Sequence, residues 1–284
     1  ESGMRWQGRR GSRNIEDRRG MSMGRGGGIS LVGMLVILGL GYFHGIDVTP
    51  LLQGEGGGQV TESVELTPAD ERAGQFVSVT LADTEEIWTD VFRRQLSEGY
   101  TPPVLVLYKG VTQSPCGGAS GATGPFYCPG DRKIYLDTSF FTTLEQRMGA
   151  GGDFAAAYVV AHEVAHHVQN ELGILGQANR IRAQASQAES NAISVRIELQ
   201  ADCLSGVWAQ AADARFDSLE RGDVAEAMNA AKQIGDDTLQ RNAGRVPQPH
   251  TFTHGTSEQR QRWFATGFET GDIRACDTFS ARQL

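Results

Sequence analysis

Apolar side chains recur at helical spacing in several stretches of this sequence. The clearest stretch covers residues 153–172, where every third or fourth residue is apolar and Gly173 follows the last one. Asp153, just after two glycines, is the expected N-cap. Weaker patterns predict further helices over residues 83–96, 191–214, 223–234 and a last stretch through Trp263 and Phe264. Asp83 is the expected cap of the first of these, and a Thr256/Gln259 capping box precedes the last.

Two short runs are typical of strands. VLVLYKG begins at Val104, and KIYLD covers residues 133–137 after a Pro-Gly-Asp turn. Many helices with few strands predict an α+β fold, a mostly helical domain with a small β-sheet.

A different pattern precedes the folded part of the chain. Residues 29–43 contain no charge, and with the next two residues the run approaches the length of a membrane-spanning helix. No small-x-small cleavage site follows, so an uncleaved transmembrane signal anchor over residues 29–45 is favoured over a removable signal peptide or a buried core helix. Residues 46–66 are polar and glycine-rich, which predicts a linker to a domain over residues 67–284.

The charge distribution sets the expected orientation. Residues 1–28 hold seven arginines and carry a net charge of about +4, whereas the whole chain of 284 residues carries −8. Positive charge stays cytoplasmic, so we expect a basic cytoplasmic tail and a single-pass anchor in the inner (plasma) membrane. The domain would then be periplasmic or extracellular. Its acidic body argues against nucleic acid as a partner.

The cysteine pattern agrees with an oxidising compartment. Cys116 and Cys128 bracket a glycine-rich loop that a local disulfide would close, which would leave Cys203 to pair with Cys276. Four cysteines allow three complete pairings, and four free thiols are the alternative. No CxxC spacing suggests metal binding by cysteine.

A metal-binding motif lies on the strongest predicted helix. His162-Glu163-Val164-Ala165-His166 is an HExxH sequence. Histidines four residues apart share a helix face and can bind one ion, while Glu163 is displaced by about 100° and can serve as a general base. His167 is expected to face away from the metal and to be structural.

Two carboxylates on a later predicted helix complete the candidate metal site. Glu198 and Asp202 lie four residues apart among apolar neighbours, where a carboxylate is usually paired or bound to metal. Glu198 is the expected third ligand of one Zn²⁺ ion, and Asp202 can hydrogen-bond the second ring nitrogen of a ligating histidine. An ordinary acidic surface is the alternative.

These segments together resemble a known bacterial family. HEVAHHVQ, ELQADC, GPFYCPGDRKIYLD, GDFAAAYVVAHE, HGTSEQRQRWF and CDTF are similar to the YpfJ-like neutral zinc metallopeptidases, over roughly residues 67–284. The ExxAD arrangement also looks like that of gluzincin membrane proteases. The resemblance implies a zincin-like domain, ligands His162, His166 and Glu198, base Glu163 and supporting Asp202. The family often has Gly where this chain has Ala165, a change that should not disturb the ligands.

The expected reaction is zinc-dependent hydrolysis of a peptide or protein substrate. His254 is the first candidate to stabilise the oxyanion, followed by His250, Arg260 and Tyr135. The KIYLD strand is a hypothetical edge for an extended substrate. A catalytically silent zinc-binding interaction module at the membrane is the main alternative, although it would not need Glu163. A deformylase-type hydrolase would need a cysteine ligand.

Overall fold

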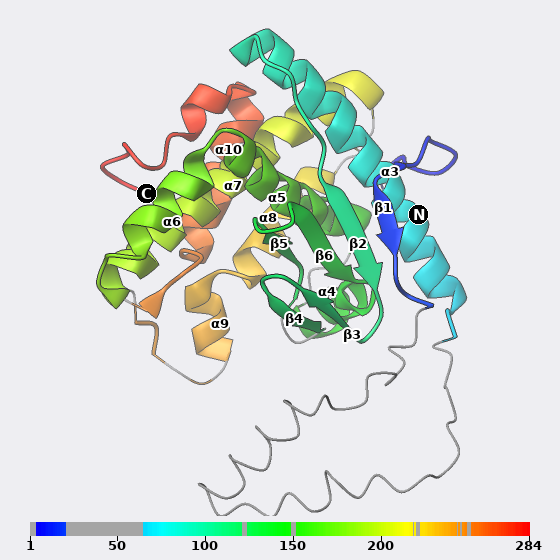
Figure 1. Ribbon diagram of the computed structural model, residues 1–284, viewed down its shortest axis with the longest axis horizontal. Helices are drawn as coiled ribbons and strands as arrows, with labels where there is room; N and C mark the ends of the chain where they lie inside the picture. The colour runs from blue at the N-terminus through cyan, green and yellow to red at the C-terminus, as the bar shows by residue number, and fades with distance from the viewer. Residues whose placement is uncertain are drawn as a thin grey trace, which may run out of the picture. The chain divides into compact units, whose positions relative to one another are not determined.

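The computed structural model describes residues 4–20, 65–120, 124–148, 152–217, 219, 222–242, 244, 246–248 and 251–284. Within them helices predominate around a small mixed sheet (Figure 1), so the predicted α+β class is confirmed. Residues 4–18 and 67–284 belong to one compact unit, and the structure describes a second unit, residues 19–66, only at its two ends.

The sheet in the described residues has the strand order β1-β2-β6-β5. Strands β1 (Ile15–Asp17), β2 (Val104–Tyr108) and β6 (Lys133–Asp137) are parallel, and β5 (Phe126–Cys128) is antiparallel to β6. A separate hairpin pairs β3 (Val111–Ser114) with β4 (Gly117–Ser120). The two predicted strands are therefore β2 and β6, at the centre of the sheet. Because β6 is paired on both sides, it offers no free edge, and the hypothesis that KIYLD adds a substrate strand is wrong.

Three helices carry the functional residues: α5 (Asp153–Glu171), α7 (Gln187–Phe216) and α10 (Ser257–Thr270). Figure 1 shows α6 (Ile174–Arg182) and α10 on the side of α5 away from β1, whereas the C-terminal end of α7 lies beside α3, where Arg215 pairs with Glu86. The remaining elements are α3 (Pro68–Val91), the π-helix η1 (Phe92–Leu96), α4 (Ser139–Met148), α8 (Asp223–Gln233), α9 (Asp236–Asn242) and the 3₁₀ helix η3 (Ile273–Cys276).

Local sequence explains where these helices begin. Capping boxes start α3 at Thr67, α7 at Ser186 and α10 at Thr256, the last as predicted. Asp83 is not a cap, because α3 starts fifteen residues earlier and Asp83 is buried in its middle. The helical pattern at residues 83–96 is thus only the second half of a longer element, whose first half has a polar outer face.

Close packing of α7 on α10 fixes the geometry around the site. Gly206 on α7 faces the backbone of Phe264 and Phe268, and Gly267 on α10 faces the backbone of Cys203. A Cβ atom at either glycine would overlap the partner helix. The two backbones can therefore touch, which brings α10 side chains close to those of α7.

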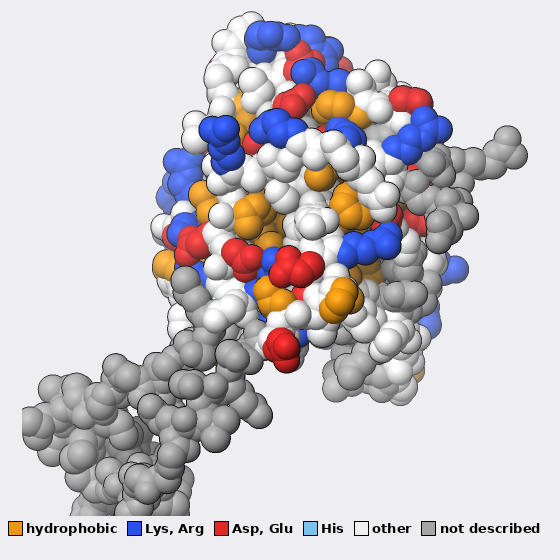
Figure 2. All heavy atoms as spheres, turned by 90° about the vertical axis from the view of Figure 1, so that its right-hand side faces the viewer, with side chains coloured by type: hydrophobic (Ala, Val, Ile, Leu, Met, Phe, Trp, Pro, Cys, Tyr) orange, Lys and Arg blue, Asp and Glu red, His pale blue; other side chains and the backbone are white. Residues whose placement is uncertain are grey.

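The N-terminal segment is part of this folded unit. Met4 and Trp6 are buried in the main core, and β1 pairs in parallel with β2. Arg9 bonds the buried Asp83 (Nη2–Oδ1 2.5 Å), and Arg10 pairs with Glu86 (3.2 Å). On the face over α3 and β1, basic and acidic side chains are interspersed (Figure 2). The predicted solvated basic tail over residues 1–28 is therefore wrong for the described residues 4–18, because Met4 and Trp6 are buried and Arg9 and Arg10 have carboxylate partners.

This pairing also affects the predicted topology. Residues 4–18 and 67–284 must lie on the same side of any membrane, because β1 and β2 share hydrogen bonds. A cytoplasmic N-terminus joined to an external domain by one crossing at residues 29–45 is incompatible with that arrangement. Residues 29–45 themselves lie outside the described residues, and so do residues 46–64 of the linker predicted over residues 46–66. Among the helices that the structure does describe, none has the length and apolar character needed to cross a bilayer.

Both favoured disulfides are present. Cys116 bonds Cys128, joining the turn between β3 and β4 to β5, and Cys203 bonds Cys276, joining α7 to η3. The structure contains no free cysteine in its described residues. A thiolate ligand, which a deformylase-type site requires, is therefore unavailable from these four residues.

Candidate metal centre

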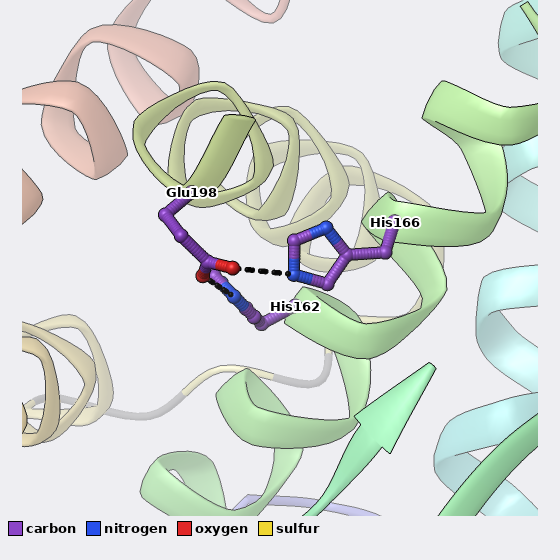
Figure 3. Close-up of side chains that lie close together, drawn as sticks. All are labelled: His162, His166 and Glu198. Carbon is purple, nitrogen blue, oxygen red and sulfur yellow. Dashed lines mark hydrogen bonds and ion pairs between the residues drawn. The ribbon is translucent and has the colours of Figure 1, made fainter. Parts of the chain in front are cut away.

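Helices α5 and α7 bring the three predicted ligands together. His162 and His166 lie one turn apart on α5, and Glu198 reaches them from α7 (Figure 3). His162 Nε2 lies 2.9 Å from Glu198 Oε2, and His166 Nε2 lies 3.3 Å from Glu198 Oε1. One ligand atom from each residue falls within 4.8 Å of the other two. Tetrahedral donors bound to zinc lie about 3.3 Å from one another, so this set fits the ion.

The electrostatics of the three side chains also fit a cation. Burial alone would lower the pKa of His162, but the carboxylates of Asp202 and Glu198 raise it to about 10. Burial likewise opposes protonation of His166, and Glu198 raises its pKa. Burial would raise the pKa of Glu198, but the two histidines hold it well below its ordinary value. The centre therefore favours positive charge, which a divalent cation would supply.

A buried network orients His162. Its Nδ1 lies 2.9 Å from Asp202 Oδ1, so Nε2 points toward Glu198. Asp202 also accepts hydrogen bonds from Tyr158 Oη and, at 2.8 Å, from Arg260 Nε of α10. The predicted supporting role of Asp202 matches this geometry, since a ligating histidine needs a partner on its other nitrogen. All three partners of Asp202 are buried.

His166 has a separate support that the sequence did not indicate. Its Nδ1 lies 2.9 Å from Oε1 of Gln169, one turn further along α5. Gln169 then donates to Ile197 O and Gln200 Oε1 of α7, both at 2.9 Å. Gln200 in turn donates to Cys276 O. Gln169 comes three residues after His166, and Tyr158 comes four residues before His162. Both spacings place the residue on the same helix face as the histidine, and this signal would have identified both residues in the sequence.

Glu163 faces the same cleft without being part of the ligand cluster. It is buried and lines the cavity with His162 and His166, and it makes no hydrogen bond to any described residue. Burial raises its pKa above the ordinary value, although His166 and His162 oppose the shift. A general base works best with a pKa near the working pH. Its position and environment match the predicted role.

The other residues predicted to stabilise the oxyanion differ in whether they line the cleft. His254 lines the cleft from the loop before α10, with Nδ1 2.9 Å from Thr253 Oγ1. Arg260 also lines it but is bound to Asp202, so it is a structural partner of the network. Tyr135 is buried on β6, where its hydroxyl donates to Asp131, and it does not line the cleft. His250 lies outside the described residues.

His167 points away from the centre, as predicted. Its Nε2 donates to Thr101 O at 2.7 Å, so Nδ1 accepts from Tyr127 Oη at 2.9 Å. Burial lowers the pKa of His167 to about 4, which keeps it neutral. It therefore connects α5 to β5 and to the segment before β2.

The metal centre opens into a cleft of about 610 Å³, within the range of small-molecule and peptide sites. Its walls come from β5 and its flanks, from α4, α5, α6 and α7, and from the loop before α10. Strand β5 forms an edge of the described sheet and lies at this cleft.

Comparison with known proteins agrees with this site. A family model described as "Putative neutral zinc metallopeptidase" matches residues 4–279. The uncharacterized protein YpfJ of Escherichia coli K12 is 46% identical over 97% of this chain and 99% of its own length. An uncharacterized protein of Mycobacterium tuberculosis H37Rv is 43% identical over 75% of this chain and 74% of its own. No solved structure matches the chain.

Proposed function

We propose that this chain, which belongs to the neutral zinc metallopeptidase family, is a zinc-dependent endopeptidase with Glu163 as general base. The observation that carries the proposal is a buried carboxylate, Glu163, with no hydrogen bond to a described residue, beside a convergent His162–His166–Glu198 cluster. A site that held zinc only for structure would have no use for a second carboxylate in the cleft beside that of Glu198.

The ligands and the base have distinct tasks. His162, His166 and Glu198 would hold one zinc ion, which when bound acidifies a water molecule and polarises a carbonyl group. Glu163 accepts the proton of the attacking water and delivers it to the leaving amine. Asp202 and Gln169 keep the two imidazoles in the tautomer that presents Nε2 to the metal.

His254 is the proposed donor to the developing oxyanion. His254 is exposed and lines the cleft from the loop before α10, so its ring can approach a bound substrate. Gly255 supports that loop, because it adopts a φ of +92° against Leu199 and a Cβ there would lie 3.0 Å from that side chain. Changing His254 to Ala should reduce kcat and leave zinc binding intact.

Strand β5 is the proposed docking edge for an extended substrate. It is unpaired on the side away from β6 among the described residues, and its flanks line the cleft. Peptides commonly add to such an edge through main-chain hydrogen bonds. This places backbone recognition on β5 in place of the interior strand β6.

We also propose that the folded unit lies in an oxidising compartment at the plasma membrane. The two disulfides support the compartment, and the apolar residues 29–45 support attachment to the bilayer. The β1–β2 pairing requires both chain halves to be on one side. Protease treatment of intact spheroplasts should reach an N-terminal tag and a C-terminal tag together; protection of the N-terminal tag alone would contradict this arrangement.

The test of the peptidase function uses the purified, zinc-loaded full chain and reduced, alkylated serum albumin. Wild type should cleave it, and Glu163→Gln should lower kcat by about 10²–10⁴-fold. Zinc content should not change. Glu258→Gln, an exposed change on α10, is the matched control. Equal cleavage by Glu163→Gln would exclude Glu163 as the base. A zinc-loaded wild type that cleaves nothing would favour the silent binding module.

A further inference from the structure

The cleft beside the metal centre combines apolar walls with a cationic side chain that no part of the site uses. Its apolar lining includes Phe126, Phe140, Val159, Leu175, Ile197 and Ile234. Its described acidic lining residues, Glu163 and Glu198, belong to the metal centre. Of the two arginines in the lining, Arg260 is bound to Asp202. The second, Arg182, has no ion pair with any described carboxylate.

Helix α6 directs Arg182 toward the cleft. Leu175, Asn179 and Arg182 follow one another at four- and three-residue spacing, so they share one face of the helix, and all three line the cavity. The intervening Arg180 is exposed and does not line it. The face that carries Arg182 is therefore the wall of the cleft, while Arg180 projects from another side of the same helix.

The guanidinium group of Arg182 is held in place but only partly used. Nε donates to Ser190 Oγ of α7 at 3.1 Å, and Nη1 lies 3.3 Å from Asn179 Oδ1. Arginine has five N–H donors in a planar fork, so other donors remain for a ligand. Both partners are neutral, which leaves the positive charge uncompensated. The side chain is half-buried, and its surroundings strengthen an electrostatic contact relative to open solvent.

We propose that Arg182 determines specificity by binding a carboxylate of the substrate, either an Asp or Glu side chain or the C-terminal carboxylate of a peptide. This inference rests on the proposed peptidase function and names its substrate class. The arginine fork matches a carboxylate with two parallel hydrogen bonds. The chain carries a net charge of −8 and would otherwise repel acidic peptides. The preferred substrate therefore has apolar residues near the scissile bond and a carboxylate at a fixed distance from it.

Mapping cleavage sites in a mixture of denatured proteins tests this directly. We expect wild type to enrich Asp or Glu over Lys or Arg by about tenfold at one position relative to the cut, the ratio typical of a charged hydrogen bond. Arg182→Glu should reverse the enrichment, and Arg180→Glu should leave it unchanged. Amidating the C-termini of a peptide library distinguishes the two carboxylate sources. Absence of any charge preference together with cleavage that is insensitive to C-terminal amidation, or the same preference in Arg182→Glu, would overturn the proposal.

A binding measurement separates failure of this inference from failure of the peptidase function. The probes are two fluorescein-labelled apolar decapeptides that differ only in one Asp or Lys, and the protein is zinc-loaded Glu163→Gln. The acidic peptide should bind about tenfold more tightly, and adding Arg182→Glu should reverse the difference. If wild type cleaves nothing but this difference persists, carboxylate recognition stands without hydrolysis. If the peptides bind equally, and amidating their C-termini does not weaken binding, the inference is wrong whatever the enzyme cleaves.

Discussion

The two walls of the cleft are built in different ways. On the helical wall, the backbones of α7 and α10 pack closely, α5 packs against α7, and His162, His166 and Glu198 each have buried partners. On the strand wall, β5 is a three-residue edge strand joined to the rest of the unit by pairing with β6, by Tyr127 and by the Cys116–Cys128 bond.

This difference indicates a division of labour. Metal ligands must be held to within a fraction of an ångström, which needs side chains locked by packing and by hydrogen bonds to a second layer of residues. A substrate-binding wall can be less constrained, because it must accept different side chains. Changes on the helical wall should therefore lower metal affinity, kcat and stability together, whereas changes on the strand wall should mainly raise KM.

Loss of the Asp202 charge should have the largest effect. Asp202→Asn leaves buried Arg260 without its counter-charge, and such a loss costs about 3–5 kcal/mol of folding stability. The orientation of His162 also weakens, so zinc affinity should fall about 10–100-fold. Urea unfolding and chelator competition measure the two effects.

A double-mutant cycle provides the control for this prediction. Arg260→Gln combined with Asp202→Asn should recover part of the stability lost in the single variant, because no buried charge then lacks a partner. It should not recover zinc affinity, because His162 still lacks its carboxylate. Additive losses in stability would contradict the proposed coupling.

Removing each disulfide in turn compares the two walls directly. Removing Cys203–Cys276, which spans 73 residues, should cost about 4 kcal/mol, and removing Cys116–Cys128, which spans 12, about 3 kcal/mol or less. Paired changes to Ala, followed by unfolding and steady-state kinetics, test both. We expect the second pair to raise KM more than it lowers kcat. The opposite order of stability losses would contradict the loop-length argument, and a kcat loss from the second pair larger than its rise in KM would contradict the assignment of the rigid wall to the helices.

Removing one hydroxyl from the strand wall should have a smaller effect. Tyr127 Oη donates to His167 Nδ1 and accepts from Asn170 Nδ2 at 3.0 Å. Tyr127→Phe should therefore cost about 1–2 kcal/mol and raise KM a few-fold, with kcat and zinc affinity nearly unchanged. A kcat loss as large as the change in KM would show that β5 positions the reacting groups as well.

The smallest effect should come from a cap far from the cleft. Burial would raise the pKa of Asp70, but Lys109 and the Thr67 cap hold it below its ordinary value. Its stabilising effect is thus present above the unfolded pKa and is lost as pH falls. Asp70→Asn should cost about 1 kcal/mol at pH 7, and less below about pH 4. Urea unfolding of both proteins at pH 7 and 3.5 measures this, with exposed Glu71→Gln as control.

Sequence patterns predicted the parts of the fold in which one helix or strand carries its own signal. The α5 periodicity, the Thr256 cap of α10 and the central strands β2 and β6 were all identifiable. Strand β1 was not, because three residues in an arginine-rich stretch resemble a solvated tail until their partner is known. Helix α6 also lacked a clear pattern, since its apolar residues are few.

The site shows the same limit. His162, His166 and Glu163 follow from spacing on one helix, and Glu198 with Asp202 from two acids among apolar neighbours. The roles of Arg260 and Gln200 depend on contacts between helices, which spacing within one helix does not determine. Arg182 is one arginine among many in the sequence, and only the position of α6 at the cleft distinguishes it.

The central claim is that His162, His166 and Glu198 together hold one zinc ion. The most direct test is the zinc affinity of the full chain, measured by competition with a chromogenic chelator. Wild type should bind one equivalent, and Glu198→Ala should lose affinity by several orders of magnitude because one of three protein ligands is gone. Asp213→Ala, a change of a partly exposed acidic residue near the other end of the same helix, should bind as wild type does. Undiminished zinc binding by Glu198→Ala would contradict the account.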